Sequence, residues 1–585
     1  MNYTLNKNGS STLKNATLSA IRRLIPLLRS EWGKITLSSA AILINAVTTL
    51  LAPVIIGRTV DTAIQQKNYH GVLVYSAILL GIYLTALVSG YIQTMVMGAV
   101  GRRVLFNLRN AIFNKLQELP IAFFNQNKTG DLISRINSDT DRLNQFFSQA
   151  LMQFMRNFFL IIGAGIFLVS LNIRLGTAAL MPALGVLILT QIISGWVKRK
   201  NLASLQSLGG MSAEIQESLN NFRVIIAFNR LDYFRDKFNE SNQKNYSASV
   251  RAGCANNIFT PIYGLASNLG QLIILAYGIL LISSGNLSIG LLISFLLYVS
   301  NFYQPLQQLA TVWASFQQAL AAFDRISEVL SMESDLKTIP SKNITSDSLL
   351  EFKDVRFSYP DGAEVLKGIS FKLKTGKTYA FVGPTGGGKT TIASLMARLY
   401  DPTQGTIILD NKDIRAYSPE ERTKKIGFIL QEPYVFTGSL LDNIFYGNPL
   451  YTTASKKELL IVLKESGLND LLKNFSQGLD TPLQTNGDSI SLGQRQLIAF
   501  VRAVLRKPEI LILDEATANI DTVTEQLLEQ ALLTLPKNTT KIVIAHRLKT
   551  IETADEIFFV NDGSVLPAGS LKHAVEMLMH IKRQS

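Results

Sequence analysis

The sequence predicts two unlike domains in one chain: an all-α domain that crosses a membrane six times, followed by an α/β domain built around a phosphate-binding loop. Three observations support this multidomain fold. Only 17% of the 585 residues are charged and 47% are hydrophobic, whereas soluble domains are about 25% charged. Long charge-free runs fill the first half of the chain. In the second half, short β-branched runs alternate with helical patterns, which is typical of α/β domains.

The first half contains enough charge-free sequence for six membrane-spanning helices. A bilayer core of about 30 Å needs roughly 20 apolar helical residues. The longest run, 252–323, holds two such lengths and is broken once, at Ser283–Asn286, where a tight turn fits. Buried helices of a soluble protein are the alternative, but they rarely stay uncharged for so long. The predicted spans are 36–57, 71–97, 149–171, 175–197, 256–282 and 288–312.

Basic residues set the orientation of the predicted membrane domain, residues 35–330. The connections 102–156 and 198–251 carry 8 and 9 lysines and arginines, and the other three carry 2, 1 and 0. Since positive charge gathers on the cytoplasmic side, we expect the long connections and both termini in the cytoplasm. Their apolar residues keep helical spacing, so the six helices should extend as cytoplasmic stalks. The stalks turn near Phe123–Ile136 and Asn220–Asn229, where short helices could press on another domain.

The composition excludes several other kinds of protein. The net charge of +14 follows from the topology, and no basic cluster is interleaved with aromatic residues, so we predict no nucleic-acid partner. The single cysteine, Cys254, can build neither an intramolecular disulfide framework nor a thiolate metal site. Residues 1–34 are polar and basic and lack the apolar core of a signal peptide, so we expect a cytoplasmic segment before an uncleaved first span.

A Gly-rich loop carries the chemistry of the second domain, residues 350–585, which follows a polar linker at 331–349. Gly383-Pro-Thr-Gly-Gly-Gly-Lys389-Thr390 matches G-x-x-x-x-G-K-[ST] between a strand and a helix. The glycines let backbone N–H groups face phosphate oxygens, Lys389 would neutralise the β/γ-phosphates and Thr390 would hold Mg²⁺. An ordinary Gly-rich turn is the alternative. The predicted nucleotide contacts are Gly383, Pro384, Thr385, Gly386, Gly387, Gly388, Lys389, Thr390 and Thr391.

A buried strand in this domain ends in two carboxylates. Ile510–Leu513 is apolar and is followed by Asp514 and Glu515, and carboxylates are costly to bury. Asp514 would bind Mg²⁺ through water, and Glu515 would polarise the attacking water as general base. A solvated strand end is the alternative, and the upstream loop argues against it. His546 follows another apolar strand, and its position alone favours a structural role.

Further motifs produce a resemblance that covers essentially the whole chain. They are Phe-Ser-Tyr359-Pro, Ile-Leu-Gln431-Glu-Pro, Ile490-Ser-Leu-Gly-Gln494 and Ala518-Asn-Ile-Asp521. In order and spacing, together with the loop and the carboxylates, they resemble an ATP-binding cassette (ABC) exporter half-transporter of the multidrug or lipid type, with a helical signature subdomain. Residues 124–135 resemble the first coupling segment of these exporters.

The resemblance implies a role for each matching residue. Tyr359 would stack on adenine. Gln431 would sense Mg²⁺ and the γ-phosphate and couple to the membrane domain. His546 would be the switch histidine, and Asp521 would belong to the D-loop. Three residues at a helix N-terminus suited to anions would contact the nucleotide of the partner chain: Ser491, Gly493 and Gln494.

The resemblance also implies the partners and the mechanism. Two ATPase domains would close head to tail on ATP and Mg²⁺, so a dimer is needed, and alternating access would follow from a ligand-dependent population shift. Two features depart from the family pattern. The signature carries Ile490 and Leu492, and Gln484–Gly487 replaces the usual Gly-Glu-Arg-Gly. These departures leave homodimer and heterodimer equally open.

Amide and aromatic residues in the fifth and sixth spans form a possible substrate cavity. Polar side chains at that depth face a protein interior or a water-filled cavity. Such a surface suits an amphipathic substrate: a lipid, a drug-like molecule or a peptide. Hydrogen bonding between helices is an equally weighted alternative. The residues are Asn268, Gln271, Asn301, Tyr303, Gln304, Gln307 and Gln308.

Other functions compete with ATP-driven export. An ATP-gated or regulatory subunit of a heterodimeric complex fits the same fusion, but the Glu515–His546 pair favours turnover. A soluble nucleic-acid-linked ATPase conflicts with six spans, and importers of this superfamily generally keep the two domains on separate chains. We expect a multi-pass protein of a bacterial inner membrane.

Overall fold

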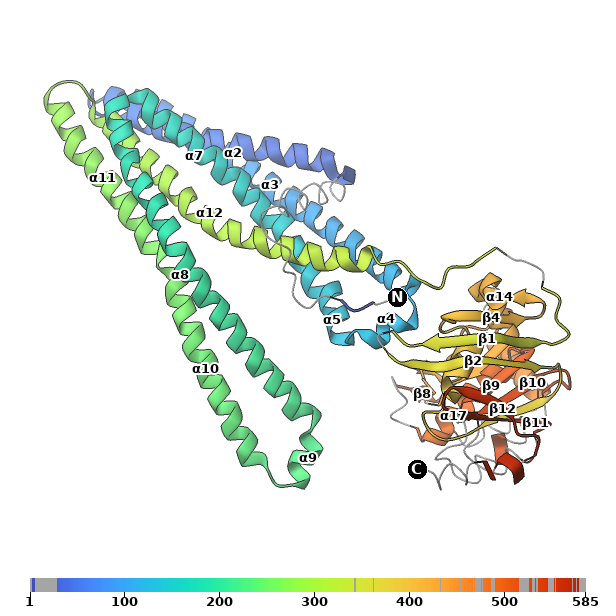
Figure 1. Ribbon diagram of the computed structural model, residues 1–585. Coiled ribbons are helices and arrows are strands. Elements are labelled where there is room, and N and C mark those ends of the chain that lie inside the picture. Colours follow the sequence, from blue (N-terminus) through green and yellow to red (C-terminus); the bar gives the residue numbers. More distant parts are fainter. Residues whose placement is uncertain are drawn as a thin grey trace. The chain divides into compact units, whose positions relative to one another are not determined.

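The structure is a computed structural model of the chain (Figure 1). The chain divides into two compact units. We call residues 6–117 and 130–331 the helical unit, and residues 1–5, 118–129 and 332–585 the α/β unit. The structure describes residues 3–5, 29–340, 344–360, 362–431, 433–451, 454–466, 468, 475, 477–484, 490–514, 526–528, 532, 535–544, 552, 554–570, 572–574 and 576–577.

The helical unit is built from long helices joined by short turns. At two of these turns a side chain caps the next helix: Asn172 accepts a hydrogen bond from the backbone N–H of Leu175, and Ser288 accepts one from Leu291. The helices are α2 (Trp32–Arg58), α3 (Tyr69–Glu118), α5 (Thr129–Ser134), α6 (Thr140–Gln145), α7 (Leu151–Leu171), α8 (Ile173–Asn220), α9 (Phe222–Ala227), α10 (Leu231–Asn257), α11 (Phe259–Ser283) and α12 (Ile289–Leu330).

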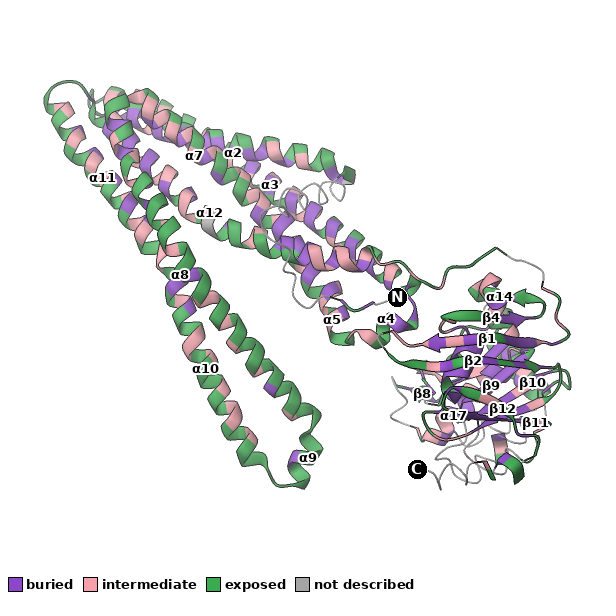
Figure 2. Ribbon diagram, viewed as in Figure 1, coloured by how far each residue is buried: buried purple, intermediate pink, exposed green. Residues whose placement is uncertain are grey.

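Among the described residues, six helical stretches are long and apolar enough to cross a membrane. Their outward faces are apolar as well: Leu80, Leu84 and Leu87 on α3 are each more than half exposed. Figure 2 shows exposed stretches along the long helices. Exposed apolar surface on this scale indicates contact with lipid. The stretches are Trp32–Ile64, Tyr69–Glu118, Thr129–Leu171, Ile173–Asn220, Leu231–Ser283 and Ile289–Leu330.

Helices α2 and α12 approach each other closely through small residues. A Cβ placed on Gly290 would collide with the carbonyl oxygen of Gly57. Because both positions are glycine, Ser294 Oγ can donate to the carbonyl of Pro53 at 2.7 Å, and Asp61 Oδ1 accepts from the backbone N–H of Gly290 at 2.8 Å. Small residues that bring helix backbones together are typical of membrane packing.

A cluster of charges joins α5 and the π-helical segment Arg135–Asp139, which connects α5 to α6, to the last turns of α12. Arg135 is 1% exposed, and its guanidinium contacts Asp131 at 3.0 Å and Glu328 at 2.8 Å. Arg325 reaches Asp131 at 2.7 Å and the buried Asp139 at 3.2 Å. Because each buried charge has an opposite partner, the desolvation cost is offset and the cluster fixes the position of this π-helical segment on α12.

The α/β unit contains a six-stranded sheet in the order β12-β11-β3-β10-β9-β6 and a four-stranded antiparallel sheet in the order β2-β1-β4-β5. In the larger sheet only β12 is antiparallel to its neighbour. A short pair, β7 with β8, lies outside both. The strands are β1 (Leu350–Ser358), β2 (Glu364–Leu373), β3 (Thr378–Val382), β4 (Gln404–Leu409), β5 (Lys412–Asp413), β6 (Ile426–Ile429), β7 (Gly438–Ser439), β8 (Pro482–Leu483), β9 (Ile510–Asp514), β10 (Thr540–Ile544), β11 (Glu556–Asn561) and β12 (Ser564–Pro567).

The centre of the larger sheet is covered on both faces. Every residue of β9 is buried, which explains why this strand is a continuous apolar run and does not alternate. The helices that accompany the sheets are α13 (Lys389–Met396), α14 (Pro419–Lys425), α15 (Leu440–Ile444), α16 (Lys456–Glu465) and α17 (Leu492–Val504). The predicted fold class, a six-span helical domain followed by an α/β domain, is confirmed.

The division into units differs from the predicted division at 350. Residues 1–5 and 118–129, including helix α4 (Ile121–Gln126), belong to the α/β unit. The linker belongs to it too, because the buried Arg398 donates to the carbonyl of Lys337 at 2.9 Å and the backbone of Ile339 donates to the carbonyl of Arg415 at 3.1 Å. These long-range contacts leave no local sequence signal.

Candidate functional site

The loop between β3 and α13 has a backbone that requires glycine. Gly383, Gly386 and Gly388 adopt φ values of +151°, +84° and +110°, in the left-handed region that side chains rarely tolerate. A Cβ on Gly383 would also collide with the carbonyl oxygen of Val560 on β11. The loop therefore curls tightly against the neighbouring strand, and α13 starts directly at Lys389.

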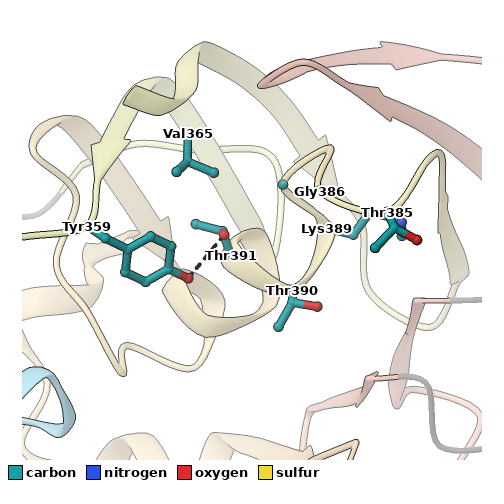
Figure 3. A pocket seen from close by; sticks show the side chains of 8 residues that line it. Tyr359, Val365, Thr385, Gly386, Lys389, Thr390 and Thr391 are labelled. Atoms are coloured by element: carbon teal, nitrogen blue, oxygen red, sulfur yellow. Dashed lines mark hydrogen bonds between the residues drawn. The ribbon is translucent and has the colours of Figure 1, made fainter. Parts of the chain in front are cut away.

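The curled loop borders a cavity of about 300 Å³, a size at the lower end of the range for ligand sites. Figure 3 shows Tyr359 on one side of the cavity and Lys389 and Thr390 at the start of α13. Gly383, Pro384 and Gly387 shape the loop without lining the cavity; the backbone N–H of Gly387 donates to the carbonyl of Pro384 at 3.2 Å. The lining residues are Tyr359, Val365, Thr385, Gly386, Gly388, Lys389, Thr390 and Thr391.

Lys389 and the start of α13 bring positive charge to the cavity. Lys389 is 5% exposed, and its ammonium donates to the carbonyl oxygens of Gly383 and Pro384, both at 2.9 Å. The first backbone N–H groups of α13 have no acceptor within the helix, and they carry the positive end of its dipole. Phosphate oxygens are the ligands that such an environment favours.

Two hard oxygen ligands meet at the edge of the cavity. Thr390 Oγ1 lies 3.4 Å from Asp514 Oδ1, to which it donates, and Asp514 is 2% exposed. Magnesium ions bound with phosphates take one or two protein oxygens and keep several waters. The hydroxyl and the carboxylate fit that ligand set. Within the described ranges, no group of three or more His, Cys, Asp or Glu residues forms a separate metal site.

The register of the large sheet aligns the ends of the strands that precede the other predicted catalytic residues in the sequence. Ile544 on β10 pairs with Phe381 on β3 and with Asp514 on β9, so these strands end at the same edge as the loop. Gln431 follows the end of β6, which pairs with β9, and Gln431 is exposed to solvent. Parallel strands with aligned ends place binding residues in one crevice. Glu515, Asp521 and His546 follow these strand ends but lie outside the described residues.

Tyr359 is fixed by aromatic neighbours. Its hydroxyl lies 3.1 Å from Thr391 Oγ1, and its ring makes edge contacts with Phe357 and Tyr400 at centroid distances of 4.9 and 5.3 Å. Burial raises the pKa of Tyr400, so this phenol stays protonated at neutral pH. Sequence reasoning missed Tyr400 and the lining residue Val365, because nothing in their local sequence distinguishes them from core residues.

The predicted signature motif, residues 490–494, lies at the start of α17. The Ser491 hydroxyl accepts from the backbone N–H of Gln494 at 3.2 Å, and the Gln494 side chain accepts from the backbone of Ser491 at 3.0 Å. This reciprocal capping box stabilises the helix start. It uses the Ser491 hydroxyl as an acceptor, so its proton can be donated to an anion. Gly493 is buried, and Gln484 is described whereas 485–487 are not.

The predicted substrate residues separate into two groups. Tyr303 does not face a cavity: it is 1% exposed and donates to the carbonyl of Ala179 on α8 at 3.0 Å. Gln271 donates to Ser300 on α12 at 3.3 Å. Both bonds join helices, because a polar group in an apolar bundle is stabilised by a neighbouring acceptor. Asn301 and Gln307 are half-buried, and three residues are exposed: Asn268, Gln304 and Gln308.

Comparison with protein families supports the same two-part organisation. Residues 35–306 match the model described as ABC transporter transmembrane region, and residues 366–518 match the model described as ABC transporter. The two matched regions lie in one chain, with the membrane region first. Their positions agree with the helical unit and with the sheets that carry the loop.

Several curated proteins are similar over most of their length. An uncharacterised ABC transporter ATP-binding protein of Bacillus subtilis, YfiC, is 33% identical over 95% of this chain and 92% of its own. A multidrug resistance ABC transporter ATP-binding and permease protein of Lactococcus lactis is 32% identical over 85% of this chain and 84% of its own. A fatty acid ABC transporter ATP-binding/permease protein of Mycobacterium bovis is 30% identical over 88% and 80%.

Proposed function

This chain belongs to the ABC transporter family, and from that premise we propose that it works in a dimer that exports an amphipathic substrate. Its membrane and ATP-binding regions are fused in one chain, which is the organisation of an exporter half-transporter. It is an integral multi-pass membrane protein whose ATP-binding domain couples ATP hydrolysis to transport. The proposal adds the dimer, the substrate class and the roles of individual residues.

The observation that carries the proposal is the cavity at the start of α13. Its buried ammonium, helix N-terminus and glycine-lined wall provide what a nucleotide triphosphate needs. Lys389 would hold the β/γ-phosphates, and Tyr359 would bind the adenine ring, since its position is already fixed by Phe357 and Tyr400. The hydrogen bonds from the Lys389 ammonium to phosphate oxygens would be charge-assisted, and such bonds are among the strongest in proteins.

Catalysis would use the carboxyl edge of the large sheet. Thr390 and Asp514 would hold Mg²⁺, which neutralises charge on the phosphates when bound. Glu515 would accept the proton of the attacking water as general base, and His546 and Gln431 would orient the water and the γ-phosphate. The alignment of β6, β9 and β10 supports these roles, because Gln431, Glu515 and His546 come one or two positions after the last residues of these strands in the sequence.

The second half of each ATP site would come from the partner chain. Ser491, Gly493 and Gln494 begin α17, where backbone N–H groups and the serine hydroxyl can bind a γ-phosphate. Asp521 would lie at the same interface. Closure of two ATPase domains around ATP would then shift the membrane helices between inward-open and outward-open states. The partner is a second half-transporter, either identical to this chain or different from it.

An amphipathic substrate agrees with the membrane helices and with the relatives. Gln304 and Gln308 on α12 and Asn268 on α11 are exposed polar groups on otherwise apolar helices, and intramembrane polar groups mark substrate paths. Two relatives are named for multidrug resistance and for fatty acids. We place the protein in a bacterial inner membrane with its ATPase domain in the cytoplasm, as the basic connections indicate.

Transport into inside-out membrane vesicles tests the proposal. Vesicles that contain the wild-type chain should accumulate a fluorescent amphipathic dye or fatty acid when ATP and Mg²⁺ are added. Vesicles with Glu515→Gln should bind ATP and accumulate nothing, because the general base is missing. ATP-dependent dissipation of an ion gradient without dye uptake would favour a gated channel, and equal uptake by both chains would refute the role of Glu515.

A further inference from the structure

The segment Tyr3–Leu5 lies in an ordered position within the α/β unit. Tyr3 is 2% exposed and Leu5 is 4% exposed, whereas Thr4 between them is exposed. This alternation is that of an extended chain with one face packed against other residues. The ring of Tyr3 meets Phe123 of α4 edge-on, with centroids 6.4 Å apart.

The end of α4 binds the backbone of this segment through two side-chain amides. Gln126 Oε1 accepts from the N–H of Tyr3 at 2.7 Å. Asn127 donates to the carbonyl of Tyr3 at 2.9 Å and accepts from the N–H of Leu5 at 3.0 Å. Because an amide offers one acceptor and two donors, Asn127 can pair with both backbone groups as a neighbouring strand would. The contact is therefore specific and not only apolar.

The hydroxyl of Tyr3 connects the segment to the linker. It accepts from the backbone N–H of Asp335 at 2.9 Å and lies 3.4 Å from the carbonyl of Glu333, to which it donates. Burial raises the pKa of Tyr3 to about 12, so the phenol keeps the proton that it donates. One side chain thus contacts both α4 and the first residues of the linker.

Helix α4 has little stability of its own. It has six residues, and no side chain caps its start at Pro120, whereas isolated helices need about 12–15 residues to be even marginally stable in water. Its position therefore depends on tertiary contacts. On one side these are Tyr3 and the amide pairing just described. On the other, Asn125 donates to the hydroxyl of Tyr400 at 2.9 Å.

Tyr400 extends these contacts to the nucleotide cavity. Its ring packs edge-on against Tyr359 at 5.3 Å, and Tyr359 lines the cavity and contacts Thr391. A continuous series of packed side chains thus runs from Tyr3 through α4 to the cavity, all within the α/β unit. Series of this kind can carry energetic coupling, provided that a measurement demonstrates it.

We propose that Tyr3 is a positioning residue that holds α4 and the linker together on the α/β unit, so that nucleotide binding at Tyr359 moves the membrane helices. The inference rests on the proposed function, since α4 lies in the segment expected to couple the two domains. Without the side chain of Tyr3, α4 would keep its contact with Tyr400 but lose its attachment to the linker. ATP hydrolysis would continue, and the response of the membrane helices would weaken.

The single cysteine of the chain provides the measurement. Cys254 is exposed on α10 in the helical unit, so its rate of modification by a polar maleimide reports on the membrane helices. The purified full-length chain, with any partner that co-purifies, would be compared in nanodiscs with and without ATP, Mg²⁺ and vanadate. The variants are Tyr3→Ala, Tyr3→Phe and the control Tyr69→Ala, which removes a tyrosine that is 87% exposed.

We expect Tyr3→Ala to hydrolyse ATP at nearly the wild-type rate while the nucleotide-dependent change at Cys254 shrinks at least about threefold. Tyr3→Phe keeps the contact with Phe123 and loses only the hydroxyl, so its nucleotide-dependent change at Cys254 should lie between those of the wild type and Tyr3→Ala. The control Tyr69→Ala should match the wild type. A wild-type response in Tyr3→Ala would overturn the inference. If Tyr3→Ala instead lost ATP hydrolysis and folding to the same extent as the response at Cys254, Tyr3 would have a general structural role and the inference would also be overturned.

The same experiment separates this inference from the proposed function. If the wild-type chain hydrolyses ATP but Cys254 never responds to nucleotide, the coupling itself is refuted and the inference falls with it. If the wild type responds and Tyr3→Ala responds equally, only the inference is refuted.

Discussion

Lys389 is the residue whose surroundings define the site most clearly. Its ammonium is buried within the loop that carries it and is held by two carbonyl oxygens of that loop. A triphosphate would bring several negative charges to this ammonium, and charge-assisted hydrogen bonds are stronger than neutral ones. The left-handed φ values of Gly383 and Gly388 make this arrangement possible, because they turn the loop around the lysine.

Replacement of Lys389 tests the residue-level account. Lys389→Ala should weaken ATP binding about a hundredfold, since a hydrogen bond to a charged group is worth up to about 3 kcal/mol and 1.4 kcal/mol is a factor of ten. Binding would be measured with a fluorescent ATP analogue on the full chain. Lys424→Ala, at an exposed lysine of α14, is the matched control and should bind normally. Unchanged affinity in Lys389→Ala would contradict the assignment.

Residues recognised by their local pattern were predictable, and residues defined by distant contacts were not. Lys389, Thr390 and Asp514 stand in patterns that the sequence displays, and the structure brings all three to one cavity edge. Tyr400 reaches the site only because β1 and α13 pack together, which no local pattern encodes. Tyr303 was predicted to line a cavity because it is a polar residue in a membrane span. In the structure its hydroxyl donates to a backbone carbonyl of a neighbouring helix.

At the scale of elements, the charged cluster around Arg135 fixes the π-helical segment between α5 and α6 to the end of α12. Three carboxylates and two arginines alternate across this contact. Because Arg135 is almost fully buried, its removal leaves the carboxylates of Asp131 and Glu328 without one of their positively charged partners. The cluster lies in the last turns of α12 (Ile289–Leu330), directly before the linker.

Arg135→Ala should therefore destabilise the full chain by about 3 kcal/mol, the lower end of the cost of breaking a buried ion pair. The control is Arg235→Ala, whose partner Asp232 forms an exposed pair on α10 worth less than about 1 kcal/mol. Apparent melting temperatures in detergent would be compared. We expect a fall of several degrees for Arg135→Ala and little change for Arg235→Ala. Equal melting temperatures would show that the cluster contributes no stability.

The elements themselves were largely readable from the sequence. Charge-free runs predicted the six long apolar helices, because a bilayer imposes length and composition on any helix that crosses it. Strand–loop–helix order likewise predicted β3, the loop and α13. The attachment of α4 and Tyr3–Leu5 to the α/β unit was not predictable, since these segments are separated from the linker by hundreds of residues and joined by side-chain amides.

At the scale of the whole molecule, one chain supplies only half of each proposed ATP site. The loop at Lys389 and the capped start of α17 at Ser491 would meet across two chains. The sequence departs from the family pattern at Gln484–Gly487, so the partner chain is either a second copy or a different half-transporter. Affinity purification followed by native mass measurement would separate two copies of this 64.6 kDa chain from a mixed pair.

ATP hydrolysis by the purified assembly in lipid nanodiscs tests the central claim most directly. The wild-type chain, alone or with the partner that co-purifies, should hydrolyse ATP only when Mg²⁺ is present, and EDTA should abolish the activity. Lys389→Ala should bind ATP about a hundredfold more weakly and lose hydrolysis, and Glu515→Gln should bind ATP without hydrolysis. Hydrolysis at the wild-type rate by both variants would contradict the account, because turnover would then come from another site or another protein.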